Sequence, residues 1–187
     1  IHGDSQHYNM MIDFISTHDM SLAQNFGYIK TLMDVNNFID YNVAQIYFDN
    51  RDWPGNNIKF WRPRTEDGKW RWLLFDTDWG FGVNAYGRGG NQNGYDYNTL
   101  EYATSPTATP NHHANPPWAT LLLRKLLENT EFKNEFINHF ADRFNTIFQP
   151  EVVCQRIDEM QKNIEEEMTR HYDKWKNSVW WSSDRLW

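Results

Sequence analysis

The sequence has little cysteine, no long apolar run and no excess of positive charge, and each shortage excludes a class of protein. Cys154 is the one cysteine among 187 residues, so no disulfide can form within the chain. No apolar run approaches the roughly 20 residues that a membrane-spanning helix needs. The formal net charge of −7 argues against a protein that binds nucleic acid through a basic face. We therefore expect neither a nucleic-acid partner nor a membrane span in this sequence.

An initial methionine and a signal-peptide pattern are also missing, because the chain starts at Ile1-His2-Gly3. This start predicts a part cut from a longer protein. A length of 187 residues is enough for a single domain, residues 1–187, with a real core. Aromatic residues, in contrast, are abundant: they make up 17% of the chain and include ten Trp. Such side chains suit a core as well as a surface that stacks on sugars.

Apolar residues recur at helical spacing in six segments, which predicts a mainly α-helical domain. Asp34, and Asn129 or Thr130, are expected to cap two of these helices. Cys154 falls in the last helix, where we expect it to be packed rather than reactive. The predicted helices cover residues 8–18, 22–32, 35–48, 117–128, 130–148 and 150–175.

One β-hairpin is predicted in the middle of the chain. Residues 58–64 and 69–75 have the composition of strands, and Asp67-Gly68 between them is a strong turn signal. The fold class is therefore mainly α (α+β), with one central hairpin. Residues 80–117 show no period and are expected to form a long irregular loop. The pair His112-His113 in that loop is expected to be solvated rather than to bind metal.

Acidic residues stand at both outer ends of the predicted hairpin. Asp52 and Asn57 precede the first strand, and Asp76 and Asp78 follow the second. Antiparallel strands lie about 5 Å apart, so the two ends should come together in one site. Two carboxylates about 4 Å apart repel by about 4 kcal/mol at an effective dielectric near 20. Oxygen ligands of this kind suit Mg²⁺ or Mn²⁺, which would remove the repulsion.

Carboxylates in this pattern also occur in other kinds of site. A calcium loop beginning at Asp76 is rejected, because Phe81 and Gly87 occupy its required Gly and Glu positions. A glycosyltransferase Asp-x-Asp site normally belongs to an α/β domain, and no βαβ pattern occurs here. A glycosidase pair of carboxylates stays open, although the spacing of Asn57 does not favour it. Each Asp could also simply begin a turn.

Phosphoryl transfer fits the order of these residues. Protein kinases use an Asp, an Asn five positions later, and a metal-binding Asp that follows a strand and precedes a Gly. Asp52 and Asn57 have this spacing, and Asp76 follows the predicted strand. Two segments resemble the spore coat protein H (CotH) kinase family. They are residues 34–62, which contain N-R-D-W-P-G-N-N, and residues 72–82, which end in D-T-D-W-G-F-G.

This resemblance implies an atypical protein-kinase-like fold that transfers phosphate from ATP to hydroxyl groups of a protein substrate, with Mg²⁺ or Mn²⁺. It also implies a secreted, cell-surface or spore-coat location. By position, Asp52 is the catalytic residue that orients the acceptor hydroxyl. Asn57 and Asp76 hold the metal and the nucleotide, and Asp78 is a further metal contact.

The sequence departs from a kinase pattern upstream of Asp52. No glycine-rich strand–loop–strand occurs there, and Lys30, the nearest candidate for the phosphate-binding lysine, lies on a predicted helix. The chain is therefore predicted to be the helical C-terminal lobe, with an N-terminal lobe of the same protein as its partner, and to be inactive alone. The alternative is a non-catalytic surface or carbohydrate-binding module, in which exposed Trp such as Trp79 or Trp118 would bind glycans.

Overall fold

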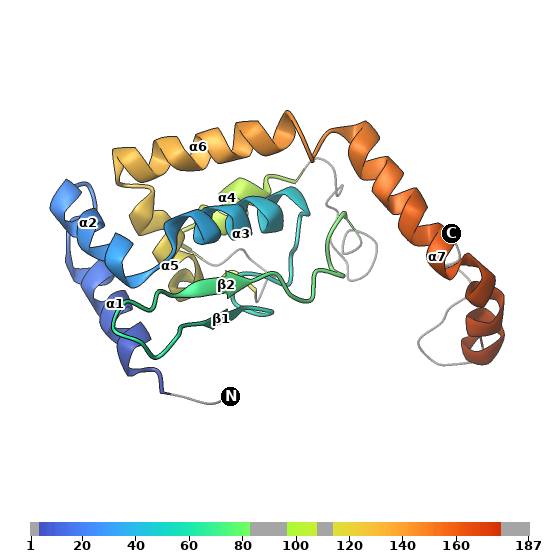
Figure 1. Cartoon of the computed structure of the whole chain (residues 1–187), viewed down its shortest axis with the longest axis horizontal. Coiled ribbons are helices and arrows are strands. Elements are labelled where there is room, and N and C mark those ends of the chain that lie inside the picture. Colours follow the sequence, from blue (N-terminus) through green and yellow to red (C-terminus); the bar gives the residue numbers. More distant parts are fainter. Residues whose placement is uncertain (1–3, 83–96, 108–113, 177–187) are drawn as a thin grey trace. The chain divides into compact units, whose positions relative to one another are not determined.

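The chain folds into helices and one short β-hairpin, as the computed structural model shows for residues 4–82, 97–107 and 114–176 (Figure 1). The mainly helical class and the antiparallel hairpin are thus confirmed. The elements are, in order, α1 (Gln6–Thr17), α2 (Ala23–Leu32), α3 (Val35–Tyr47), β1 (Lys59–Trp61), β2 (Arg71–Leu73), α4 (Thr99–Thr104), α5 (Pro117–Leu126), α6 (Thr130–Phe144) and α7 (Pro150–Trp175).

The chain divides into two compact units, residues 1–140 and 141–187. The first unit holds the hairpin and a core formed by the apolar faces of its helices. Asp34 caps α3 as expected, because its carboxylate accepts a hydrogen bond from the Asn37 N–H at 3.1 Å. Fully buried core side chains come from α1, α2, α3, α5 and α6, for example Met11, Ile15, Phe26, Ile29, Ile39, Leu126 and Phe132.

The two strands are shorter than the sequence predicts. They pair in antiparallel register, Phe60 opposite Trp72, over three residues each. Pro63 carries no N–H and cannot continue the ladder, which is the physical reason for the early end. The Arg62 guanidinium instead donates to the Gly68 and Thr65 carbonyls at 2.7 and 2.9 Å. Gly68 fits here because a Cβ would meet the Pro63 carbonyl oxygen at 2.2 Å.

The hairpin is fixed to α3 and to the connection before it. Trp72 gives its N–H to the Asn37 side-chain oxygen at 2.6 Å, and its carbonyl accepts from the Asn37 amide at 3.3 Å. Trp70 exchanges backbone hydrogen bonds with Asp34 and Leu32. The side-chain amide of Asn37 therefore substitutes for a third strand and positions β2 against the helix.

A short helix, α4, lies inside the stretch that the sequence predicts to be irregular, and that prediction is wrong for residues 99–104. Asn98 caps α4 by accepting the Glu101 N–H at 3.0 Å. Thr99 and Tyr102 are buried. Six residues are too few for an apolar period to be recognised. His112-His113 and the Trp-rich tail lie outside the described residues.

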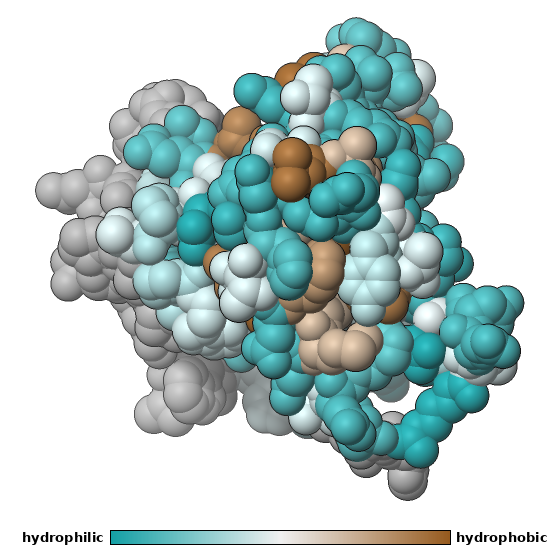
Figure 2. Space-filling model, turned by 90° about the vertical axis from the view of Figure 1, so that its left-hand side faces the viewer, coloured by the Kyte–Doolittle hydropathy of each residue, from teal (hydrophilic) through white to brown (hydrophobic). Residues whose placement is uncertain are grey.

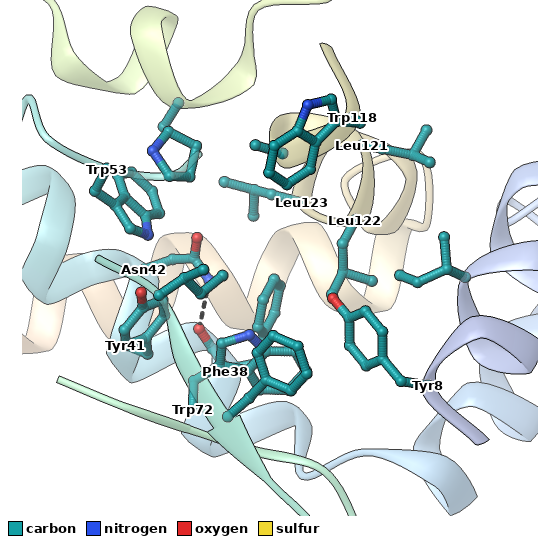
Figure 3. Close-up of a pocket in the computed structure, with 16 residues that line it drawn as sticks. Tyr8, Phe38, Tyr41, Asn42, Trp53, Trp72, Trp118, Leu121, Leu122 and Leu123 are labelled. Carbon is teal, nitrogen blue, oxygen red and sulfur yellow. Dashed lines mark hydrogen bonds between the residues drawn. The ribbon is translucent and has the colours of Figure 1, made fainter. Parts of the chain in front are cut away.

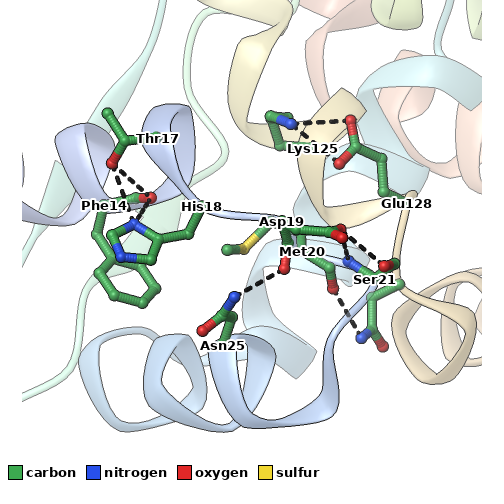
Figure 4. A network of polar contacts seen from close by, with 10 residues as sticks. Phe14, Thr17, His18, Asp19, Met20, Ser21, Asn25, Lys125 and Glu128 are labelled. Carbon is green, nitrogen blue, oxygen red and sulfur yellow. Dashed lines mark hydrogen bonds and ion pairs between the residues drawn. The ribbon is translucent and has the colours of Figure 1, made fainter.

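Polar contacts hold the α1–α2 turn against the start of α6 (Figure 4). Asp19 accepts from the N–H and hydroxyl of Ser21 at 2.9 and 2.7 Å. The Asn129 amide donates to the Met20 carbonyl at 2.9 Å, and its oxygen accepts from the Glu131 and Phe132 N–H groups. Asn129 is therefore the cap of α6, one of the two residues that the sequence predicts for it.

The second unit contains α7, whose residues are all described and of which none is buried. Cys154 is exposed, so the prediction that it is packed is wrong. The apolar stripe of α7, formed by Ile157, Met160 and Ile164, is exposed as well.

The face of the molecule in Figure 2 is mostly hydrophilic, and hydrophobic side chains form small areas on it. Within the described ranges, no helix has the length and apolarity that a bilayer crossing requires.

Candidate active site

The loop that leads into the hairpin begins with a buried ion pair. After α3 ends, Asp49 adopts the left-handed backbone region, with φ of 53°. Its carboxylate receives two hydrogen bonds from the Arg51 guanidinium, at 2.9 and 3.0 Å, and one from the Thr99 hydroxyl at 2.8 Å. The guanidinium also lies 3.5 Å from the centre of the Tyr97 ring. The loop is therefore anchored to α4 and the residues before it, about 50 positions away in sequence.

The residues on either side of Arg51 extend this anchor toward Asp52. Asn50 is fully buried, donates to the Gln45 side chain at 2.8 Å, and accepts the Asp52 N–H at 3.1 Å. The Tyr102 hydroxyl donates to the Arg51 carbonyl at 3.1 Å. Burial of Tyr102 raises the pKa of its phenol far above the ordinary value, so this donor keeps its proton. The peptide bond between Arg51 and Asp52 therefore has both its carbonyl and its N–H hydrogen-bonded to buried side chains.

The Asp52 carboxylate is half-buried and faces the other predicted ligands. Its Oδ2 accepts from the amides of Asn56 and Asn57, at 3.0 and 2.9 Å. The same Asn57 nitrogen lies 3.5 Å from the carbonyl oxygen of Asp76. The structure therefore brings Asp52, Asn57 and Asp76 together, as the hairpin argument predicts. Since Asn57 uses its nitrogen for both contacts, its carbonyl oxygen is the atom that would serve a cation.

The segment that leaves the hairpin returns to the same loop. Trp79 accepts the Arg51 N–H at 3.4 Å through its carbonyl, and the Phe81 N–H donates to the Phe48 carbonyl. Asp76 does not continue the extended strand, because its φ is 52°. Asn57, opposite, has φ of 49°. Asp and Asn tolerate this region better than other non-glycine residues, and strained backbone of this kind gathers at functional sites.

Asp76 and Asp78 are both exposed, and their carboxyl groups interact. Partial loss of hydration raises the pKa of Asp76, and the hydrogen bond with Asp78 raises it further. The charges of Asp78 and Asp52 act in the same direction. All three carboxyl groups therefore contribute to one electrostatic site that disfavours full ionisation, as the argument from repulsion expects.

Lys59 is a component of this site that the sequence does not reveal. Its charge opposes the carboxylates and lowers the pKa of Asp76. The ammonium lies 3.3 Å from the centre of the Phe75 ring, the residue directly before Asp76. Lys59 stands on β1 opposite Leu73, so only the strand register places it beside the acidic end. An exposed lysine on a strand gives no such signal by itself.

The acidic residues alone do not make a complete metal centre. In the part of the chain that the structure describes, no three His, Cys, Asp or Glu side chains are grouped closely enough to hold an ion. Mg²⁺ in nucleotide enzymes commonly takes one or two carboxylates and completes its shell with phosphate oxygens and water. Asp76 with Asn57 or Asp78 fits that smaller donor set, and all the ligand atoms are oxygens.

The Trp side chains that could form a sugar-binding surface differ in exposure. Trp118, at the start of α5, is 66% exposed, whereas Trp79 is only partly exposed. Trp79 and Trp118 belong to different segments of the chain.

Comparison with known proteins supplies the family. The family model described as CotH kinase protein matches residues 2–184. The match covers nearly the whole chain, which therefore belongs to the CotH kinase family, as the sequence motifs predict. Comparison with curated proteins and with solved structures finds no match. At the level of the family, the chain has a kinase-like function.

Proposed function

We propose that this member of the CotH kinase family contributes the catalytic and metal-binding loops of a phosphotransferase that moves phosphate from ATP to hydroxyl groups of a protein. The observation that carries the proposal is the Asn57 side chain. It contacts the Asp52 carboxylate at 2.9 Å and lies 3.5 Å from the Asp76 carbonyl, so the two ends of the hairpin meet at one residue.

Asp52 is the residue that we assign to the acceptor hydroxyl. Two amides donate to its Oδ2 at 3.0 and 2.9 Å, which fixes the orientation of the carboxylate. Such a carboxylate can accept a hydrogen bond from a substrate hydroxyl and receive its proton. The buried network around Asn50 and Arg51 keeps this orientation fixed before substrate binds.

Asp76, Asp78 and Asn57 are the residues that we assign to the divalent cation. Partial loss of hydration raises the pKa of Asp76, and the hydrogen bond with Asp78 and the charges of Asp78 and Asp52 raise it further; a cation would stabilise the ionised carboxylates. When bound, Mg²⁺ supplies positive charge at the phosphate oxygens and withdraws electron density from the group being transferred. Lys59 places a second, permanent positive charge beside the same carboxylates, where phosphate oxygens would lie.

The chain offers one wall of the cleft that such a reaction needs. We propose that the described helices and hairpin act as the C-terminal lobe, and that an N-terminal lobe of the same protein supplies the second wall and covers the nucleotide. The assay therefore belongs in the whole protein, with ATP and Mg²⁺ present.

The test is phosphate transfer by the Asp76→Asn variant of the whole protein. We expect Mg²⁺-dependent transfer of the terminal phosphate to fall by about 100-fold or more, because the remaining ligands hold the cation poorly. Circular dichroism should show an unchanged fold, since Asp76 is exposed. Asp67→Asn, the same change at the opposite end of the hairpin, is the matched control and should keep full activity. Equal activity in both variants would overturn the assignment.

A further inference from the structure

A cavity of about 230 Å³ lies within the first unit, and Trp53, the residue after Asp52, forms part of its lining (Figure 3). Side chains from α1, α3, both strands, α4 and α5 line it, and it is partly open to solvent at the exposed side chain of Trp118. The lining is mainly aromatic and aliphatic, and includes Tyr8, Phe38, Trp53, Trp72, Trp118 and Leu122. Protein interiors rarely leave apolar spaces of this size empty, because the lining loses contacts with partner atoms.

One polar group in the lining has no acceptor. Trp53 is 2% exposed, and its indole N–H is the one buried side-chain polar atom without a hydrogen-bond partner among the described residues. The Tyr41 ring meets the indole edge-to-face, with ring centroids 6.2 Å apart. Burial raises the pKa of the Tyr41 phenol, and its contacts with the side chains of Gln45 and Trp53 partly offset this rise, but the indole N–H of Trp53 does not reach hydrogen-bond geometry. A buried donor left in this state is unfavourable, and an acceptor in the cavity would satisfy it.

The cavity has no charged side chain among the described residues that line it. Its two phenols stay neutral even at moderately alkaline pH, because burial raises the pKa of Tyr8 and of Tyr41 to about 12. A charged molecule would find no counter-ion there, so an occupant must be uncharged. An apolar cavity of about 150 Å³ accepts benzene, so this one has room for roughly ten non-hydrogen atoms.

We propose that this cavity is a binding site for an uncharged, mostly apolar molecule of about ten non-hydrogen atoms that carries one hydrogen-bond acceptor. The acceptor receives the Trp53 N–H, and the apolar part fills the space between Phe38, Trp72 and Leu122. Because Trp53 directly follows Asp52, an occupant would rest against the loop that carries the assigned catalytic residue. The site is separate from the nucleotide site and does not depend on the chain being a phosphotransferase.

Acetophenone and α-methylstyrene are the probes that test the proposal. Both are planar, uncharged and contain nine non-hydrogen atoms, but only acetophenone has an acceptor oxygen in place of a CH₂ group. Saturation-transfer NMR with competition, or calorimetry, should show saturable binding of acetophenone to the whole chain. Because the oxygen satisfies the buried Trp53 N–H, acetophenone should bind about tenfold more tightly than α-methylstyrene.

Substitutions that fill the cavity locate the binding. Leu122→Trp places a larger ring in the cavity and should abolish acetophenone binding while the melting temperature stays equal or rises. Ala119→Leu is a milder filling change for use if the first variant does not fold. Leu22→Trp, at a residue that is 46% exposed and does not line the cavity, should bind as the parent does. Lack of saturable binding, equal affinity for both probes, or binding retained in a folded filled variant would each overturn the proposal.

Discussion

The two ends of the hairpin are built in opposite ways, although they form one site. The entering end is held by buried polar groups: Asn50 is fully buried, and Arg51 is 3% exposed and paired with Asp49. The leaving end carries Asp76 and Asp78, both exposed, with carboxylates that repel one another. The Asn57 side chain reaches the Asp76 carbonyl at 3.5 Å, and the backbone hydrogen bond from Arg51 to Trp79 also joins the two ends.

This difference suggests separate roles: the entering end positions the Asp52 carboxylate, and the leaving end supplies carboxylates for a cation. The entering end is preorganised, because its orientation is set by hydrogen bonds that are complete within the fold. The leaving end stays unfavourable as long as its charges are unbalanced, and a cation is the simplest way to balance them. Stability should therefore depend on the entering end, and metal binding on both.

The largest effect on stability is expected from Asp49→Ala. This change leaves the Arg51 guanidinium buried without its carboxylate, which should lower the free energy of unfolding by about 3–5 kcal/mol. Asp78→Ala removes a carboxylate too, but from an exposed position where it is repelled, so it should change stability by less than about 0.5 kcal/mol. Urea denaturation followed by circular dichroism measures both. A similar loss of unfolding free energy in the two variants would contradict the distinction between a preorganised entering end and a repulsive leaving end of the hairpin.

A smaller effect is expected at alkaline pH, and it arises at the entering end. Tyr41 supports this end through Gln45 and has a pKa raised by burial from 10.0 to about 12. The unfolded chain releases the Tyr41 proton near pH 10, whereas the folded chain keeps it, so folding stability falls as the pH rises from about 10 to 12. For a shift of this size the loss is about 2–3 kcal/mol.

The Tyr41→Phe variant isolates this term from the titration of Lys and Arg. Its denaturation midpoint should fall less steeply than that of the parent between pH 10 and 12, while the two should have parallel profiles between pH 7 and 9. Identical slopes above pH 10 would show that Tyr41 ionises equally well in the folded chain.

Much of the fold follows from local sequence signals. The helices with a clear apolar face, the cap at Asp34 and the turn before Lys69 are all readable, because the residues that decide them lie within a few positions of one another. Helix α4 is too short for a period to be seen. Packing of Cys154 was wrongly predicted, because an apolar stripe on α7 does not say whether anything covers it.

The sequence predicts only the part of the site that follows from the pairing of the hairpin strands. Antiparallel pairing places Asn57 beside Asp76, and the sequence shows both the strands and the turn. The Asp49–Arg51 pair could not be found this way, because its partner Thr99 lies 50 residues away with no intervening pattern. Lys59 is placed by the strand register alone. The roles of Asp52, Asn57, Asp76 and Asp78 stay predictions.

Binding of Mn²⁺ to the chain and to a set of variants tests the central claim most directly, that the two ends of the hairpin share one cation. Calorimetry should show that Asn57→Gly, which keeps the positive φ of this residue, and Asp76→Asn each weaken binding by about tenfold or more, while the control Asp67→Asn does not. If one ion is shared, the double variant should lose little more than the weaker-binding single variant. Unchanged affinity in either single variant, or fully additive losses in the double variant, would contradict a shared cation site.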